Sequence, residues 1–155
     1  MAKMQAVRYH DISCGHRVVG HEGKCRHLHG HNYRIHFYCE ANSLDDVGRV
    51  IDFSVIKEKL CMWLENNWDH KFLAWNNDSL MSGIHYSVNN DDDQTQADRQ
   101  HFNESIVWVT FNPTAENIAN YLLETVGPEE LHGTGVTLVK VVVEETAKCS
   151  VDCSI

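Results

Sequence analysis

The first forty residues of the chain alternate between apolar and polar positions, a pattern that places every second side chain on one buried face of a strand. Strand-forming residues dominate segments 4–15 and 28–41. Two glycines lie in the intervening segment 17–27, which predicts a loop there. Residues 1–41 are therefore expected to form a long hairpin.

The apolar spacing changes to three and four residues in two later segments, which is typical of helices with one buried face. A first helix is expected over about 53–67, with Asp52 as its N-cap. Its buried face would carry Phe53, Ile56, Leu60, Trp63 and Leu64. A second helix is expected to begin at Asn112 as the cap, with proline at its first position, and to end at the Gly-Pro pair 127–128. Its apolar stripe would be Ala115, Ile118, Leu122 and Val126.

The remaining segments complete a single domain over residues 1–155. Residues 76–105 are polar and acidic at their centre, so we expect an exposed insertion there, disordered in part. Short strands are expected over 106–111 and 149–155, and a longer one over 135–145. One face of the longer strand would carry Val139, Val141, Val143 and Glu145. Strands that flank paired helices predict an α+β layer of helices on an antiparallel sheet.

Composition narrows the class of protein. A formal net charge of −9 argues against general binding to nucleic acid or to anionic membranes. No run approaches the roughly 20 apolar residues that span a bilayer, and the first residues do not resemble a signal peptide, so a cytoplasmic location is expected. The six cysteines include no C-x-x-C pair and are expected to be free thiols.

Histidines concentrate where the hairpin strands meet the loop. His29 and His31 are two apart on a strand and share a face, and the hairpin would bring His16 beside them. Three imidazoles without a fourth protein ligand describe a catalytic zinc site with an open position. A closed structural zinc with Cys25 as fourth ligand is the alternative, and a lone His-x-His pair is more often structural.

Other candidate groups carry weaker signals. Cys25 lies in a glycine-flanked loop suited to a catalytic thiol, which basic neighbours or zinc would activate. Asp69 and His70 could act as a proton-transfer pair, although adjacent Asp-His pairs at helix ends are common. Glu145 ends an apolar strand face and is either solvent-facing or a buried acceptor. Glu116 alone fits the favourable first turn of a helix.

Several separated motifs together resemble one known family, across nearly all of the chain except about 76–105. They are His16, Gly-Lys-Cys25, His29-Gly-His31-Asn-Tyr, Ile51-Asp-Phe, Asp69-His70, Asn112-Pro-Thr-Ala-Glu-Asn and Glu144-Glu145-Thr146. In this order they resemble the 6-pyruvoyltetrahydropterin and 6-carboxytetrahydropterin synthases. The resemblance implies a tunnelling fold, or T-fold, with a four-stranded antiparallel sheet and two helices on one face. It also implies homo-oligomeric barrels, usually a hexamer of two stacked trimers, with sites at subunit interfaces.

The same resemblance implies roles for single residues. Zinc would be held by His16, His29 and His31. Cys25 would be the catalytic base or acid, and Asp69 with His70 the proton relay. Glu145 would anchor the pterin ring, and Thr114 with Glu116 would match the family's Thr-x-Glu element.

The spacing between Cys25 and His29, three residues, resembles the carboxy-forming enzymes of the queuosine pathway. The expected substrate is then 7,8-dihydroneopterin triphosphate, and the products are 6-carboxy-5,6,7,8-tetrahydropterin, acetaldehyde and triphosphate. A pyruvoyl-forming synthase, a related pterin aldolase and a non-catalytic zinc-stabilised assembly protein remain as alternatives. The loop 17–27 is locally basic, so Arg17 and Lys24 are expected to bind the triphosphate. Cys14, which stands where the family usually has alanine, could compete for the metal.

Overall fold

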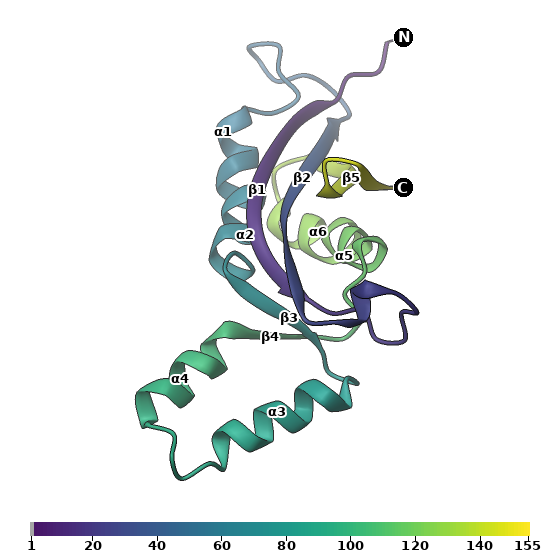
Figure 1. Ribbon diagram of the computed structural model, residues 1–155. Helices are drawn as coiled ribbons and strands as arrows, with labels where there is room; N and C mark the ends of the chain where they lie inside the picture. The colour runs from purple at the N-terminus through teal and green to yellow at the C-terminus, as the bar shows by residue number, and fades with distance from the viewer. Residues whose placement is uncertain (1) are drawn as a thin grey trace.

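Six strands form one curved sheet in the computed structural model, which describes residues 2–155 (Figure 1). The strand order is β4-β3-β1-β2-β5-β6. The strands are β1 (Ala6–His16), β2 (His29–Ala41), β3 (Lys71–Trp75), β4 (Ile106–Val109), β5 (Val136–Thr146) and β6 (Cys149–Ser154). The four antiparallel strands β1, β2, β5 and β6 confirm the expected α+β T-fold core.

Two further strands extend this core: the strand predicted over 106–111 is present as β4, whereas β3 was not predicted. β3 pairs with β1 in parallel, but only through Cys14 and Gly15, and β4 pairs with β3 in parallel. The sheet is therefore mixed. Sequence reasoning missed β3, because its five residues follow directly on a helix and are too few to show a period.

Successive side chains of β1 and β2 point to opposite faces of the sheet, which we call the inner face, covered by helices, and the open face. Ile12, Tyr33 and Phe37 are buried on the inner face. Val7 and Tyr9 lie on the open face and are 38% and 50% exposed. The helices of the core cover only the inner face, as expected for this fold (Figure 1).

A β-bulge changes the predicted face of β5. The pairing with β2 shifts between Tyr38 and Cys39, where Cys39 faces Leu138 and Tyr38 faces Lys140. Val139 is the extra residue, so Leu138 enters the core at 4% exposure and the prediction for Val139 is wrong. Val141 and Val143 are fully buried as predicted.

The first predicted helix is present as one continuous run. It consists of α1 (Phe53–Ile56), the π-helical turn η2 (Lys57–Cys61) and α2 (Met62–Asn67). Asp52 caps it by accepting a hydrogen bond from the Ser54 N–H. Phe53, the first residue of the helix, was predicted on the buried face but is 57% exposed, and the buried face begins at Ile56.

The second helical run consists of α5 (Ala115–Tyr121), η3 (Leu122–Val126) and α6 (Gly127–Glu130), and its predicted stripe is buried. Both predicted ends are wrong. Thr114, not Asn112, caps the helix by accepting from the Asn117 N–H. Pro128 does not stop the run, because it stands in the first turn of α6, where a missing N–H is tolerated.

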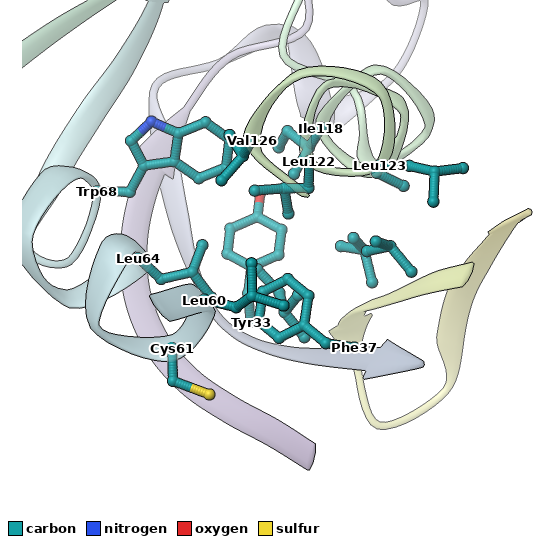
Figure 2. Packing of buried hydrophobic residues seen from close by; sticks show 14 of the residues in the cluster. Tyr33, Phe37, Leu60, Cys61, Leu64, Trp68, Ile118, Leu122, Leu123 and Val126 are labelled. Atoms are coloured by element: carbon teal, nitrogen blue, oxygen red, sulfur yellow. The ribbon is translucent and has the colours of Figure 1, made fainter. Parts of the chain in front are cut away.

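The core forms where these two helical runs meet above the sheet (Figure 2). Leu60 and Leu64 come from the first run and Leu122 and Val126 from the second, and all four are 2% exposed or less. Their side chains surround Tyr33, whose hydroxyl points toward the second run (Figure 2). The core therefore reaches along β2 to within two residues of His31.

The insertion is ordered into two helices, unlike the partly disordered segment expected. They are α3 (Ser79–Asn89) and α4 (Gln96–Ser105), which project from the end of the sheet beside β3 and β4 (Figure 1). Caps explain the order: Asp78 and Thr95 accept backbone N–H groups at the two N-termini. Among residues 2–155, none of the helices combines the length and apolar character needed to cross a bilayer.

Candidate metal centre and proton-transfer groups

Three imidazoles meet at the end of the β1–β2 hairpin. His16 lies directly opposite His29 in the register, and Cys14 lies opposite His31. All three histidines belong to the inner face, since period two carries Tyr33, His31 and His29 to one side of β2. The hairpin therefore assembles the imidazoles by register alone.

A carboxylate joins them from β5. The Nε2 atoms of His16 and His29 are 3.1 Å apart. Glu145 Oε1 lies 3.3 Å from His16 Nε2 and 3.1 Å from His31 Nε2. One ligand atom from each of the four residues lies within 4.8 Å of the others. The fourth coordination position, for which the sequence predicted no protein ligand, therefore lies next to Glu145 in this conformation.

Backbone carbonyls orient two of the rings. The Nδ1–H of His16 donates to the Pro113 carbonyl and that of His29 to the His27 carbonyl, each at 2.6 Å. Since a carbonyl can only accept, both Nε2 atoms are left with a lone pair aimed at the cluster. The Tyr33 hydroxyl, 3.2 Å from His16 Nε2, lies over the same ring. These contacts are typical of the groups that fix metal-binding histidines.

His31 provides the test of whether a cation fits. Its Nε2 atom is buried and makes no hydrogen bond, despite its close approach to Glu145. Burial lowers the pKa of His31, which favours the neutral ring that a metal requires. The contact with His16 lowers the pKa of Glu145, which keeps this group a carboxylate. One anionic and three neutral donors suit a divalent ion such as zinc, iron or nickel.

Neither nearby cysteine belongs to this group. Cys25 lies in the short helical turn η1 (Lys24–Arg26), is partly buried, and its carbonyl accepts from the Val18 N–H at 2.8 Å. Its thiol is not among the four clustered ligands, so this geometry does not favour the closed Cys-His₃ alternative. Burial raises the pKa of Cys14 to about 12, so that residue stays a neutral thiol and a poor ligand.

Asp69 and His70 are paired, but they lie on the open side of the sheet. Asp69 Oδ1 accepts from the Ser13 N–H at 2.9 Å, and Asp69 Oδ2 lies 2.7 Å from His70 Nδ1. Although burial raises the pKa of Asp69, hydrogen bonds from Ser13 and His70 outweigh it and hold that pKa below its usual range. The His70 side chain is 80% exposed.

The pair borders a cavity of about 650 Å³ that other polar residues of the open face also line. They include Asp11, Ser13, Asn32, Arg34 and Glu144. Ser13 precedes Cys14 and Asn32 follows His31, so both point away from the imidazole cluster. Within one chain, the Asp69–His70 pair and the metal centre therefore face opposite ways.

Comparison with known proteins decides the family. The family model described as 6-pyruvoyl tetrahydropterin synthase matches residues 6–154. The chain belongs to the 6-pyruvoyl tetrahydropterin synthase family. A curated relative from Rickettsia felis, named 6-carboxy-5,6,7,8-tetrahydropterin synthase, is 31% identical over 96% of this chain and 99% of its own length. A relative from Halobacterium salinarum, named a probable 6-carboxy-5,6,7,8-tetrahydropterin synthase, is 32% identical over 87% of this chain and 76% of its own length.

Two solved structures share the fold of this chain. An uncharacterised protein from Wolinella succinogenes superposes with a TM-score of 0.84, at 25% identity over 99% of both chains. The 6-pyruvoyl tetrahydropterin synthase of Caenorhabditis elegans superposes with a TM-score of 0.65, at 22% identity over 100% of this chain and 97% of that one. The second likeness speaks for the T-fold alone.

The family's Thr-x-Glu element lies at the start of α5. Thr114 uses its hydroxyl to cap the helix, and Glu116 is exposed in the first turn. Asn112, predicted as the cap, instead clamps the loop: its side chain accepts from the Val19 N–H at 3.1 Å and donates to the Val19 carbonyl at 2.9 Å. Substrate contacts of Thr114 and Glu116 stay predictions.

The two cations expected to bind phosphate differ in their surroundings. Lys24 is exposed and forms no ion pair within residues 2–155. Arg17 forms a two-point ion pair with Asp78, at 2.6 and 2.7 Å, and also donates to the Arg26 carbonyl. Three of the five guanidinium N–H groups of Arg17 are therefore engaged within the protein, and its contact with the triphosphate stays a prediction.

Sequence reasoning missed the residues that support the site. Asp78 is 2% exposed, and the single signal for it is its place before Ser79 at the start of a helix. Tyr33 could have been found from its position two residues after His31. The carbonyls of Pro113 and His27 carry no side-chain signal at all.

Proposed function

We propose that this chain is a zinc-dependent 6-carboxy-5,6,7,8-tetrahydropterin synthase. The reaction would convert 7,8-dihydroneopterin triphosphate and water to 6-carboxytetrahydropterin, acetaldehyde and triphosphate. The observation that carries the proposal is the group of His16, His29, His31 and Glu145, with one buried imidazole nitrogen unpartnered. The names of the full-length curated relatives support this reaction over others of the family.

The metal and the protein would divide the chemistry between them. Zinc, when bound, would supply Lewis acidity toward the oxygen atoms of the substrate side chain. Cys25 would move a proton at its sulfur, and His70 would move one at Nε2, with Asp69 holding the opposite ring nitrogen. Glu145, which lies against His16 and His31 in this conformation, would turn away from the metal position when substrate binds and anchor the pterin ring through charge-assisted hydrogen bonds.

A second copy of the chain would complete the site, because Asp69–His70 and the metal centre face opposite ways within one chain. Residues 6–13 of β1 have no strand neighbour on the side of β3, and β6 ends the sheet on the other side. Pairing such edges between copies closes a barrel and removes them from solvent. We propose a homohexamer of two stacked trimers, located in the cytoplasm and serving queuosine or related 7-deazapurine synthesis.

Cations on the loop around Cys25 would hold the triphosphate. Lys24, Arg26 and His27 are exposed there, which supports this placement despite the acidic net charge. Neutralising Lys24 is expected to raise the KM for the triphosphate and to leave the KM for a dephosphorylated pterin unchanged.

The deciding experiment incubates metal-analysed protein with 7,8-dihydroneopterin triphosphate and identifies the pterin by mass. 6-Carboxytetrahydropterin with acetaldehyde would support the proposal. A product that has lost triphosphate but no side-chain carbon would instead identify the pyruvoyl-forming reaction. The names of the family and of several solved relatives keep that reaction as the second candidate.

The Cys25→Ser variant separates an enzyme from a zinc-stabilised assembly protein. We expect it to keep wild-type zinc and to form no product, because the thiol lies outside the clustered ligands. Loss of zinc together with folding stability would favour the non-catalytic role.

A further inference from the structure

The loop that carries Cys25 is tied to the rest of the molecule by Arg17. This residue directly follows the metal-centre residue His16 in sequence. One of its terminal nitrogens donates to the Arg26 carbonyl at 3.2 Å, beside Cys25. The next residue, Val18, donates its N–H to the Cys25 carbonyl. Two consecutive backbone carbonyls, that of Cys25 and that of the residue after it, are therefore held from one short segment.

Asp78 fixes the other end of Arg17. The Nε and a terminal nitrogen of Arg17 donate to the two carboxylate oxygens of Asp78, the two-point geometry that sets a guanidinium in one orientation. The carboxylate is 2% exposed, so solvent screens the pair little. A lysine could not reproduce this contact, since it has no planar fork.

The same Asp78 carboxylate also caps the first helix of the inserted hairpin, the pair of helices α3 and α4 within residues 76–105. Asp78 Oδ1 also accepts from the backbone N–H groups of Leu80 and Met81, which caps α3. The N-terminus of α3 therefore holds the carboxylate, the carboxylate holds Arg17, and Arg17 holds the Cys25 loop. The insertion contributes no ligand to the metal centre within residues 2–155, yet it is mechanically joined to it.

We propose that Arg17 and Asp78 are positioning residues for Cys25, and that the inserted hairpin sets the placement of the catalytic thiol through them. The kinetic part of this inference rests on the proposed function, in which Cys25 transfers a proton. Positioning of this kind affects the chemical step more than binding, because displacement of a reacting group by about 1 Å can cost on the order of a hundredfold in rate.

The test compares Asp78→Asn with the wild-type protein. The amide oxygen can still cap α3, but the charge that holds Arg17 is gone. We expect kcat for dihydroneopterin triphosphate to fall by about tenfold or more with KM nearly unchanged. We also expect wild-type zinc content and faster alkylation of Cys25 by iodoacetamide, measured by peptide-resolved mass spectrometry well below the unfolding temperature.

Two controls keep the result specific. Asp92→Asn changes an exposed carboxylate in the same insertion that makes no hydrogen bond or ion pair within residues 2–155, and it should leave every readout unchanged. Cys149, which is exposed on β6, serves as an internal reference for alkylation. Arg17→Lys keeps the charge and loses the fork, so it should reproduce the Asp78→Asn effects if that variant folds poorly.

Wild-type kcat and wild-type Cys25 alkylation in both variants would overturn the inference. The alkylation measurement needs no turnover. If the wild-type protein forms no pterin product, the proposed function fails while the positioning of Cys25 is still decided by that measurement.

Discussion

The three imidazoles of the metal centre are held by different contacts, and this difference decides what each substitution would do. His16 is fully buried and hydrogen-bonded to the Pro113 carbonyl, so its removal would disturb the fold as well as the cluster. His31 makes no hydrogen bond through its cluster-facing nitrogen. It is therefore the ligand whose loss best isolates metal binding.

We expect His31→Ala to lose most of its zinc while its free energy of unfolding without metal stays within about 0.5 kcal/mol of the wild-type apoprotein. Zinc is measured by mass spectrometry of the purified protein, and stability by urea denaturation after chelation. His132→Ala, at an exposed position, is the matched control and should keep its zinc. Full zinc occupancy in His31→Ala would show that this ring is not a ligand.

The Asp78 carboxylate makes stability depend on pH. Hydrogen bonding to Arg17 holds the pKa of Asp78 below its ordinary value of 3.8. The folded state therefore binds fewer protons than the unfolded state, and the contribution is present above about pH 4 and is lost as pH falls through the folded pKa. Urea denaturation between pH 2.5 and 6 should give a shallower acid decline for Asp78→Asn than for wild type. Parallel declines would contradict the assignment.

At the level of single residues, sequence periodicity was sufficient to bring His16, His29 and His31 together, because register and period two act locally. It could not find the Arg17–Asp78 pair or the Pro113 carbonyl contact. Their partners are 61 and 97 positions apart in the sequence, and only the packed fold brings them together.

Two glycines in helices illustrate how an element's surroundings override its propensity. Both positions would gain up to about 1 kcal/mol from alanine on helix propensity alone. A Cβ at Gly127 in α6 would lie 2.5 Å from Leu138 Cδ2 and 2.9 Å from its Cβ. A Cβ at Gly83 in α3 would meet nothing within 4 Å.

We therefore expect Gly127→Ala to destabilise the protein by about 1–3 kcal/mol and Gly83→Ala to stabilise it by up to about 1 kcal/mol. Chemical denaturation of the two variants in parallel measures both. Stabilisation at both positions would mean that Leu138 moves aside, and no change for Gly83→Ala would mean that α3 contributes nothing to the measured unfolding.

Elements with a clear apolar period were predictable, and those set by tertiary contacts were not. The helix after Asp52 and the hairpin followed from spacing and capping. The order of α3 and α4 was missed because the apolar residues of this segment are sparse, although Asp78 and Thr95 are good caps. The bulge at Val139 was missed because a strict period of two has no place for an extra residue.

At the scale of the whole molecule, the open face of the sheet is the feature that a single chain leaves unexplained. It carries the Asp69–His70 pair and a polar cavity, and it has no helix over it. An assembly in which each site draws Cys25 and His70 from different copies would account for both.

Subunit mixing tests this arrangement. Cys25→Ser and His70→Ala are each expected to be inactive as pure assemblies. If the two residues of a site come from different copies, dissociation and reassembly of an equal mixture should restore about a quarter of wild-type activity, since random pairing rebuilds that share of sites. No recovery, with size-exclusion chromatography confirming mixed assemblies, would place both groups of a site in one chain.

The backbone at His70 has one further consequence. Its φ angle is 61°, the left-handed conformation that costs most side chains about 1 kcal/mol and that glycine adopts freely. Selection for thermal stability alone would favour glycine at position 70. An imidazole at such a position would then lower thermal stability in exchange for catalytic activity. Ancestral or laboratory variants selected for heat resistance should gain stability and lose activity when this single residue changes to glycine.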